Sequence, residues 1–460
     1  MPTIDETLTQ VGREQHGLKW ERDTFSLTPV WTVDPCIQVI KDICYELLRQ
    51  PYPRILSDIE TKVEFLDEGA FNRVYGVDAI AKVKASSDAQ LKTGIVETIQ
   101  HFKYVFRVSL PVDPRLKSSS EVATIQYLNE CTTVPVTTVL HSSQSAKNAL
   151  GFEWMLQTYV PGHKLSSIWH QLGDAGRERM IEQLAAIQTE LFKKTKFRQI
   201  GNIYRRRDEQ VSGDSAQDNS AKSSPHHFYV GKIVSKPFLL KSAVMEIVNR
   251  GPFRTTADWL SAQLENVVLV CEGLQESSDK NDLEAAERSG EIAQRLLALL
   301  PKLFPDSGSE EETFLFHEDL SQENIFCRED GTITAILDWE ATSCLPLWAA
   351  YDFPQLLQGA DYPEEPDPTN YRRGADDLLF QDRLLMWQRM KLKGTYMEAM
   401  RRIWPEWWGE YMKCKSHAQR DFRNAVDLCE SELSWNTITK WLDANDQLQG
   451  TDKYAPLALY

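Results

Sequence analysis

The sequence predicts an α+β protein, in which a strand-rich lobe near the N-terminus precedes a larger, mainly helical lobe. Residues 62–110 alternate apolar and polar side chains, which is the pattern of half-buried β-strands. From Arg177 onward, apolar residues recur every three or four positions, as they do along amphipathic helices. A chain of 460 residues with 42% hydrophobic residues and 13 Trp is long and apolar enough for two or three packed units.

The charge balance argues against a nucleic acid as the partner. Lys and Arg number 51 and Asp and Glu number 67, which gives a formal net charge of -16. We expect no nucleic-acid partner, because no basic cluster is long enough to follow a phosphate backbone. The eight cysteines are scattered without C-x-x-C or Cys/His spacing, so we expect reduced, structural thiols and no zinc site.

The N-terminal stretch gives no sign of a targeting segment. Residues 1–23 carry several acidic side chains and no apolar run, which argues against a secretory signal and against an acid-poor transit peptide. No later stretch reaches the length of a membrane span. We therefore expect a cytosolic protein with no membrane partner, and the sequence indicates no oligomeric state.

Changes of pattern along the chain predict four regions. An amphipathic helix is expected at residues 34–50, where Asp-Pro opens the apolar repeat and Pro51 ends it. A stretch at residues 205–227 is poor in apolar residues and is expected to be a mobile insertion. The regions are an N-terminal arm and helix at 1–60, a strand-rich lobe at 61–160, a larger lobe at 161–360 that contains the insertion, and a C-terminal helical extension at 361–460.

The most informative stretch is residues 314–353, FLFHEDLSQENIFCREDGTITAILDWEATSCLPLWAAYDF. It places His317, Asp319 and Asn324 on a predicted tight loop, and the apolar strand that follows ends on Asp338. Phosphoryl transfer needs one carboxylate beside the acceptor hydroxyl, and an amide oxygen and a second carboxylate to hold metal ions. A short hairpin after Asn324 would return Asp338 to its side. The spacing therefore favours this chemistry over a plain polar turn before a buried strand.

The same segment resembles the aminoglycoside phosphotransferase and choline kinase-like families, in a fungal-type form. The resemblance lies in HEDLSQEN at residues 317–324, which has the pattern H-x-D-x-x-x-x-N, and in DWE at residues 338–340, which has the pattern D-x-[DE]. These families share a two-lobed protein-kinase-like fold. The resemblance thus implies an N-terminal antiparallel sheet lobe that binds nucleotide, at residues 61–160, and a larger, mainly helical C-terminal lobe that is catalytic, at residues 161–360.

The resemblance also implies roles for single residues. Asp319 would be the catalytic base, and His317 would brace the loop that carries it. Asn324 and Asp338 would be the ligands of Mg²⁺. Glu340 would be either a supporting residue of this site or a plain surface acid.

A turn at residues 69–72, GAFN, lies between two apolar strands. A nucleotide-binding lobe places the loop that covers the phosphates at such a turn, so Gly69 and Asn72 are candidate nucleotide-binding residues. A single glycine at a hairpin turn is also typical of an ordinary turn. The resemblance favours the functional interpretation.

Arg107 stands on the strand HFKYVFRVSLP, on the face opposite the large apolar side chains. In the resemblance it takes the place of the lysine that contacts the α- and β-phosphates. Arginine can hold phosphate with two nitrogens, but its planar fork is bulkier than an ammonium group. Lys103 on the same face, and Lys82 and Lys84 on a nearby segment, are alternative cations. A solvated basic strand face is the other interpretation.

Residues 118–121, SSSE, open the helix predicted next. Ser118 and Glu121 have the spacing of a capping box, in which the glutamate would only satisfy the first amides of its own helix. In the kinase-like interpretation Glu121 instead forms an ion pair with Arg107. The family resemblance favours the ion pair.

Two further regions are candidates for binding. The strand at residues 151–162, GFEWMLQTYVPG, runs into a Pro-Gly turn that suits a hinge, where the backbone near Gln157 and Tyr159 would bond adenine. The acceptor pocket is expected after the metal aspartate, where acidic residues would attract a cationic substrate or be ordinary exposed loop acids. These acids are Glu364, Glu365, Asp376 and Asp377. His226 and His227 in the insertion lack the spacing of a metal site.

The sequence thus predicts a small-molecule kinase that transfers the γ-phosphoryl group of ATP or GTP to a hydroxyl group, with Mg²⁺ as the metal. The acceptor is not determined, since branches of these families phosphorylate aminoglycosides, choline, sugars or amino-acid derivatives. The alternative is a pseudokinase, or a nucleotide-binding or interaction protein without turnover. Arg107 and the glycine-poor turn favour the pseudokinase, and the Trp-rich C-terminal tail favours an interaction protein.

Overall fold

The computed structural model describes residues 15–22, 27–49, 56–85, 96–206, 227–239, 248–275, 279–305, 310–350, 353–414, 418–447 and 455–457. The chain forms two compact units, each with its own core. The sheet unit comprises residues 1–126, 137–159 and 238–246. The helical unit comprises residues 127–136, 160–237 and 247–460.

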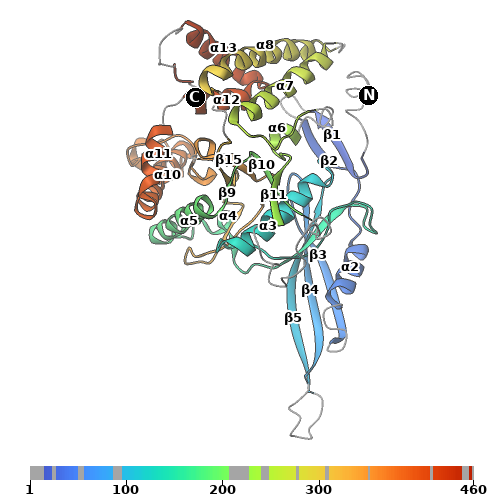
Figure 1. The fold of residues 1–460 in the computed structure, drawn as a ribbon. Helices are drawn as coiled ribbons and strands as arrows, with labels where there is room; N and C mark the ends of the chain where they lie inside the picture. Colours follow the sequence, from blue (N-terminus) through green and yellow to red (C-terminus); the bar gives the residue numbers. More distant parts are fainter. Residues whose placement is uncertain are drawn as a thin grey trace. The chain divides into compact units, whose positions relative to one another are not determined.

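A five-stranded antiparallel sheet with the order β3-β4-β5-β7-β6 forms the centre of the sheet unit (Figure 1). The alternating stretch at residues 62–110 supplies most of its three long strands, as predicted, and the turn at residues 69–71 joins the first two. The elements are β1 (Leu18–Arg22), β2 (Leu27–Trp31), α2 (Ile37–Arg49), β3 (Leu56–Glu68), β4 (Asn72–Ala85), β5 (Val96–Ser109), α3 (Leu116–Cys131), β6 (Val139–Ser143) and β7 (Glu153–Thr158).

The core of the sheet unit lies between the sheet and α2, which packs beside β3 in Figure 1. Ile40 and Cys44 of α2 are completely buried there, against Phe106 and Val108 of β5. Each large apolar side chain that is fully buried contributes about 1.5–3 kcal/mol. Because successive residues of a strand point to opposite faces, burying Phe106 and Val108 turns Arg107 to the other face. The predicted helix and the predicted strand faces are confirmed.

A glycine is required where β1 begins. Gly17 has a φ of +83°, in the left-handed region, and a Cβ atom on it would lie 2.3 Å from the ring of Phe152. Both conditions exclude a larger residue. The β1–β2 ribbon, paired antiparallel with Leu18 opposite Trp31, therefore starts against the core of the sheet unit.

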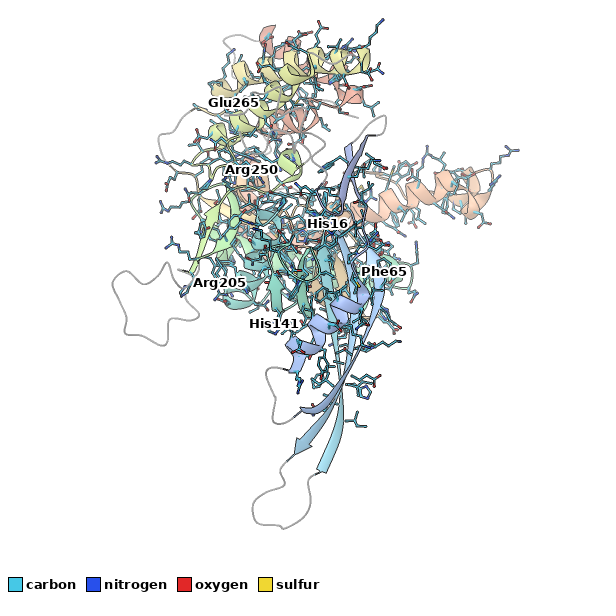
Figure 2. All side chains as sticks on the ribbon, turned by 90° about the vertical axis from the view of Figure 1, so that its right-hand side faces the viewer. His16, Phe65, His141, Arg205, Arg250 and Glu265 are labelled. Carbon is cyan, nitrogen blue, oxygen red and sulfur yellow. The ribbon has the colours of Figure 1, made fainter. Side chains whose placement is uncertain are left out.

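The helical unit contains two small sheets, with the orders β11-β10-β15-β12-β9 and β14-β13-β8. Its strands are β8 (His163–Lys164), β9 (Lys196–Phe197), β10 (Gly201–Arg205), β11 (Phe228–Gly231), β12 (Thr313–Phe316), β13 (Ile325–Cys327), β14 (Ile333–Ile336) and β15 (Ser343–Pro346). The segment before α7 is fixed to this framework by Arg250, which Figure 2 labels. Its buried guanidinium donates twice to the carbonyl of Ile233, at 3.1 and 2.7 Å.

Helices make up most of the rest of the described chain. They are α4 (Leu165–Ile168), α5 (Asp174–Lys194), α6 (Lys236–Leu239, across the boundary between the units), α7 (Thr256–Leu274), α8 (Lys280–Leu303), α9 (Leu347–Ala350), α10 (Leu378–Ile403), α11 (Pro405–Cys414), α12 (Ala418–Leu428) and α13 (Glu432–Gln447), with short 3₁₀ turns at Gln355–Leu357, Pro368–Asn370 and Gly374–Asp376. Helices α7, α8, α12 and α13 pack together (Figure 1). In α13, Trp435, Ile438 and Leu442 are buried, at the helical spacing of apolar residues that the sequence shows from Arg177 onward.

The predicted fold class, with its antiparallel N-terminal sheet and a larger, mainly helical C-terminal part, is confirmed. Most of the predicted insertion, including His226, lies outside the described residues. Among the described residues, no helix combines the length and the apolar character needed to cross a membrane.

Candidate active site

The candidate catalytic loop, residues 317–324, connects β12 to β13 in the helical unit. His317 is buried, with its Nε2 3.0 Å from the carbonyl of Leu337, and its Nδ1 accepts from the backbone N–H of Asp319 at 3.2 Å. Its ring meets the buried ring of Trp339 edge-on, at 4.7 Å. Burial lowers the pKa of His317, so the ring is neutral near pH 7 and donates from Nε2. His317 thus ties the loop to the end of β14.

Asn324 closes the loop from its other end. Its side-chain nitrogen donates to the carbonyl of Asp319 at 2.9 Å, and its own carbonyl accepts from the N–H of Leu337 at 2.8 Å. The short β13–β14 hairpin, with Ile325 opposite Ile336, thus returns the chain so that Asp338 follows directly on the residue bonded to Asn324. The hairpin expected from the sequence is present.

Asp338 adopts a left-handed backbone, with a φ of +62°. Aspartate is one of the few residues other than glycine that tolerate this conformation. The chain turns sharply here, between the buried strand β14 and the buried Trp339. Glu340 follows and is half-buried.

The carboxylate of Asp319 is not used to hold the fold. Within the described ranges it forms no hydrogen bond or ion pair, whereas the backbone N–H and carbonyl of this residue are both bonded inside the loop. The residue is partly exposed. The loop therefore fixes the position of Asp319 and leaves its carboxylate available for a ligand.

The donor atoms at this loop suit Mg²⁺. Carboxylate and amide oxygens are hard ligands. The amide nitrogen of Asn324 donates to the carbonyl of Asp319, so the amide oxygen is the atom of this side chain that would bind a metal ion. In the part of the chain that the structure describes, no three His, Cys, Asp or Glu side chains gather into a metal cluster. Mg²⁺ in phosphoryl-transfer sites is held by one or two protein ligands together with substrate phosphates, so Asn324 and Asp338 fit such a site.

In the sheet unit, Arg107 and Glu121 form an ion pair. Arg107 Nη1 lies 2.5 Å from Glu121 Oε1, and the side chains are 12% and 0% exposed. The capping-box alternative is wrong, because α3 begins at Leu116 and Ser118 therefore lies inside the helix. The N–H of Ser119 already donates to the carbonyl of Arg115 at 2.9 Å. The hydroxyl of Ser118 is buried and has no hydrogen-bond partner among the described residues.

A lysine that the sequence analysis did not single out lies close by. Lys117 is 2% exposed, and its Nζ donates to Asn72 Oδ1 at 3.2 Å, where Ser109 Oγ also donates at 3.0 Å. Lys117 and Glu121 are one helical turn apart on α3, and Arg107 and Ser109 are two apart on β5, so each pair shares one face of its element. We refer to Asn72, Arg107, Ser109, Lys117 and Glu121 as the cation cluster. The four-residue spacing of Lys117 and Glu121 was the signal that could have revealed it.

The turn at residues 69–72 is held against this cluster. The N–H of Gly69 donates to the carbonyl of Asn72 at 2.9 Å, and Leu110 donates to the carbonyl of Phe71 at 2.8 Å. The buried side chain of Asn72 then accepts the two bonds from Ser109 and Lys117. The turn is thus fixed at its last residue, and Gly69 and Asn72 both belong to it.

The remaining candidates in the sheet unit are less close to the cluster. Gln157 is buried inside the sheet, between Val105 and Val139, whereas Tyr159 lies just beyond β7 and is 43% exposed. Lys103 is exposed, with its Nζ 5.7 Å from the centre of the Tyr159 ring. It is four residues from Arg107 on β5, about 13 Å along the strand. The side chains of Lys82 and Lys84 lie outside the described residues.

The acidic residues proposed for an acceptor pocket divide into two groups. Asp377 caps α10, because its Oδ1 accepts from the N–H of Leu379 at 3.0 Å. Glu364, Glu365 and Asp376 are exposed. Asp377 therefore has a local structural role of the kind that N-cap aspartates ordinarily have.

Comparison with known proteins gives matches over more than half of the chain. The model of the phosphotransferase enzyme family matches residues 90–392, well over half of the chain. A subtelomeric hrmA-associated cluster protein of Aspergillus fumigatus is 22% identical over 357 residues, which cover 68% of this chain and 65% of that protein. The mitochondrial protein "Altered inheritance of mitochondria protein 9" of Eremothecium gossypii is 21% identical over 320 residues, which cover 60% of this chain and 51% of that protein. The match thus spans less than two thirds of the length of these curated relatives.

Solved structures give weaker likenesses. The GDP complex of aminoglycoside 2'-phosphotransferase-IIIa has a TM-score of 0.34 and 15% identity, and the match covers 84% of this chain and 99% of that chain. The ADP and spectinomycin complex of spectinomycin phosphotransferase has a TM-score of 0.31 and 11% identity, with coverages of 68% and 71%.

Proposed function

Because the chain belongs to the phosphotransferase enzyme family, we propose that it transfers the γ-phosphoryl group of ATP or GTP to a hydroxyl group of a small molecule. The observation that carries the proposal is the catalytic loop. There, an uncommitted Asp319 carboxylate is fixed through its backbone next to Asn324, and Asp338 follows at the end of the returning hairpin. A carboxylate beside two oxygen ligands is the arrangement that phosphoryl transfer requires.

Asp319 orients the acceptor hydroxyl and takes its proton. In a loose transition state, alignment of the hydroxyl matters more than proton removal, so a rigid backbone around the carboxylate is useful. His317 supplies that rigidity as a neutral ring that donates at Nε2 and accepts at Nδ1. It does not act as an acid or base in this scheme, since both ring nitrogens are engaged by the backbone.

Asn324 and Asp338 would hold Mg²⁺ through the amide oxygen and the carboxylate. A metal ion held there would supply positive charge that neutralises the triphosphate. Because both ligands offer hard oxygen atoms, they favour Mg²⁺ over softer metal ions.

The cation cluster binds the phosphates of the nucleotide in this proposal. Arg107 presents several N–H donors, so one edge of its guanidinium can stay with Glu121 while another faces phosphate. Asn72 and Gly69 shape the turn over the phosphates, and Lys117 adds a second buried cation beside it. The backbone near Gln157 and Tyr159 is proposed to bond the adenine or guanine base.

A nucleotide-binding protein without turnover is the rival function. Arg107 in the place of a lysine and a phosphate turn with a single glycine favour it. The cytosolic location stays a prediction, and one relative carries a mitochondrial name.

The proposal is tested by measuring phosphoryl transfer from Mg-ATP and Mg-GTP to a panel of small alcohols. The variant Asp319→Asn is expected to keep nucleotide affinity and to lower turnover by about 10²- to 10⁴-fold. Asp330→Asn, which alters an exposed acid on the turn between β13 and β14, is the matched control and is expected to change neither. Nucleotide binding without transfer to any acceptor would support the rival, and equal turnover of Asp319→Asn and wild type would remove Asp319 from its role.

A further inference from the structure

The residue between His317 and Asp319 is engaged by the C-terminal helices. Glu318 Oε1 accepts from Arg423 Nη2 of α12 at 2.8 Å, although the two residues are far apart in the sequence. Arg423 also donates from Nη1 to the carbonyl of Ala349, the third residue of α9, at 2.8 Å. Its guanidinium lies 5.5 Å from the centre of the Trp259 ring and 3.6 Å from the carboxylate of Asp427. One side chain thus joins α7, α9, α12 and the catalytic loop.

The surroundings of Arg423 hold its side chain more firmly than solvent holds the side chains of an exposed ion pair. The Arg423 side chain is 16% exposed, and Trp259 beneath it is 4% exposed. A planar guanidinium held by a carbonyl on one edge and stacked on an aromatic ring loses little further freedom when it binds a carboxylate. The Arg423 guanidinium that donates to Glu318 is thus also held by contacts that lie outside the loop.

Glu318 lies between two residues that bonds within the loop and its hairpin hold in place. His317 is fixed to Leu337 on one side, and Asp319 is fixed by its N–H and carbonyl on the other. The Glu318 side chain leaves the loop between them, so its contact with Arg423 restrains the peptide units next to Asp319. A shift of about 1 Å at a reacting group lowers the rate by about 10²-fold, so a restraint at this point bears on catalysis.

We propose that Arg423 is a positioning residue, through which the C-terminal helical extension holds the catalytic loop in its working conformation by way of Glu318. The proposal rests on the proposed function, because a held loop matters only if Asp319 orients an acceptor. The extension then does more than pack, because α12 contacts the loop at Glu318 from outside residues 317–337. This contact adds to the bonds that the N–H groups of Ser166 and Leu356 donate to the carbonyls of Gln322 and Leu320.

The test compares full-length wild type with Arg423→Gln and Arg295→Gln. Arg295 of α8 is the matched control, because it is 25% exposed and pairs with Asp443 and Asp446 of α13 at 2.8 Å each, within the same group of helices. The measurements are amide hydrogen exchange of peptides that cover residues 314–327, and kcat and KM for turnover of Mg-ATP and Mg-GTP, with water as the acceptor if no alcohol serves.

Arg423→Gln is expected to speed exchange in the loop by about tenfold while exchange in α13 stays as in wild type. Its kcat is expected to fall by about tenfold with KM for the nucleotide within about twofold, which a general loss of stability would not produce. Arg295→Gln is expected to speed exchange in α13 and to leave the loop and kcat unchanged.

Glu318→Ala removes the same contact from its exposed side and guards against misfolding of the Arg423 variant, and it should reproduce the faster exchange of the loop. Loop exchange equal to wild type in both variants would overturn the proposal, and so would equal loosening of the loop in Arg295→Gln. If wild-type protein turns over no nucleotide, the proposed function fails, and the exchange measurement by itself still decides whether Arg423 holds the loop.

Discussion

The catalytic loop of the helical unit and the cation cluster of the sheet unit gather their side chains over different lengths of chain. In the loop, the hydrogen bonds that His317, Asp319 and Asn324 form among the described residues stay within residues 317–337. In the cluster, Asn72 meets Ser109 and Lys117, which lie 37 and 45 residues away in the sequence. The loop is therefore visible as a motif, whereas the cluster exists only after a sheet and a helix have packed.

The two regions also differ in what their polar groups do for the fold. Bonds in the loop run mainly to the backbone, and the Asp319 carboxylate takes no part in them, so it can be changed without loss of structure. Glu121 and Lys117 are almost completely buried, and removing one partner of a buried charge is costly. Changes in the cluster should thus affect stability and binding together, and a change of the Asp319 carboxylate should affect turnover alone.

The largest effect is expected from Arg107→Met, which takes away the cation paired with a fully buried carboxylate. We expect a loss of unfolding free energy of about 3 kcal/mol, together with loss of nucleotide binding. Denaturant unfolding and thermal-shift measurements with Mg-ATP check both. In Arg107→Met with Glu121→Met, stability should largely return while binding does not. Full stability of the single variant would contradict the view of the cluster as a buried charge system.

Lys117→Met is expected to have a smaller effect, which separates the phosphate role of the cluster from its structural role. We expect affinity for Mg-ATP to fall by about tenfold, as befits one charge-assisted phosphate contact, while affinity for adenosine does not change. Isothermal titration with both ligands measures the difference. Lys103→Met on the exposed part of β5 is the control and should leave both affinities as they are. Equal losses for adenosine and Mg-ATP would show that Lys117 only maintains the fold.

The pH dependence of stability tests the loop. Because burial lowers the pKa of His317, the unfolded chain binds a proton at higher pH than the folded chain does. Stability from this residue is present above about pH 6.5 and falls as the pH drops toward the lower, folded-state pKa, by at most about 1.4 kcal/mol per pH unit. Denaturant unfolding between pH 7.5 and 5 measures it. His317→Gln should flatten the curve in this window, and an unchanged slope would mean that other groups produce it.

The smallest effect is expected from Ser118→Ala. A true N-cap serine contributes about 1 kcal/mol, but the buried hydroxyl of Ser118 lacks a hydrogen-bond partner among the described residues. We therefore expect the free energy of unfolding to change by no more than about 0.5 kcal/mol. The removal of an unsatisfied hydroxyl favours a gain in stability. Thermal unfolding of the variant measures this, with Thr255→Ala at the N-cap of α7 as a control that should lose stability. A loss of about 1 kcal/mol in Ser118→Ala would contradict this and would support the capping-box interpretation of Ser118.

The sequence by itself determined the elements whose pattern is local. Alternation gave the long strands and the face of Arg107, helical spacing gave α2, α5, α7 and α8, and the spacing within residues 317–338 gave the loop and its hairpin. Each of these depends on residues close in the sequence, because side-chain periodicity and short turns are set by neighbours. The roles assigned to these residues stay predictions.

Only the tertiary structure decided how distant polar groups are satisfied. In the structure, α3 begins at Leu116, which excludes a cap at Ser118. Glu121 instead pairs with Arg107. Lys117 is buried and bonded to Asn72, and Arg423 of the C-terminal extension is bonded to Glu318. The physical reason is common to all three: a buried or half-buried polar group must find its partner in space, and the sequence pattern of neither partner specifies which distant segment packing will bring to it.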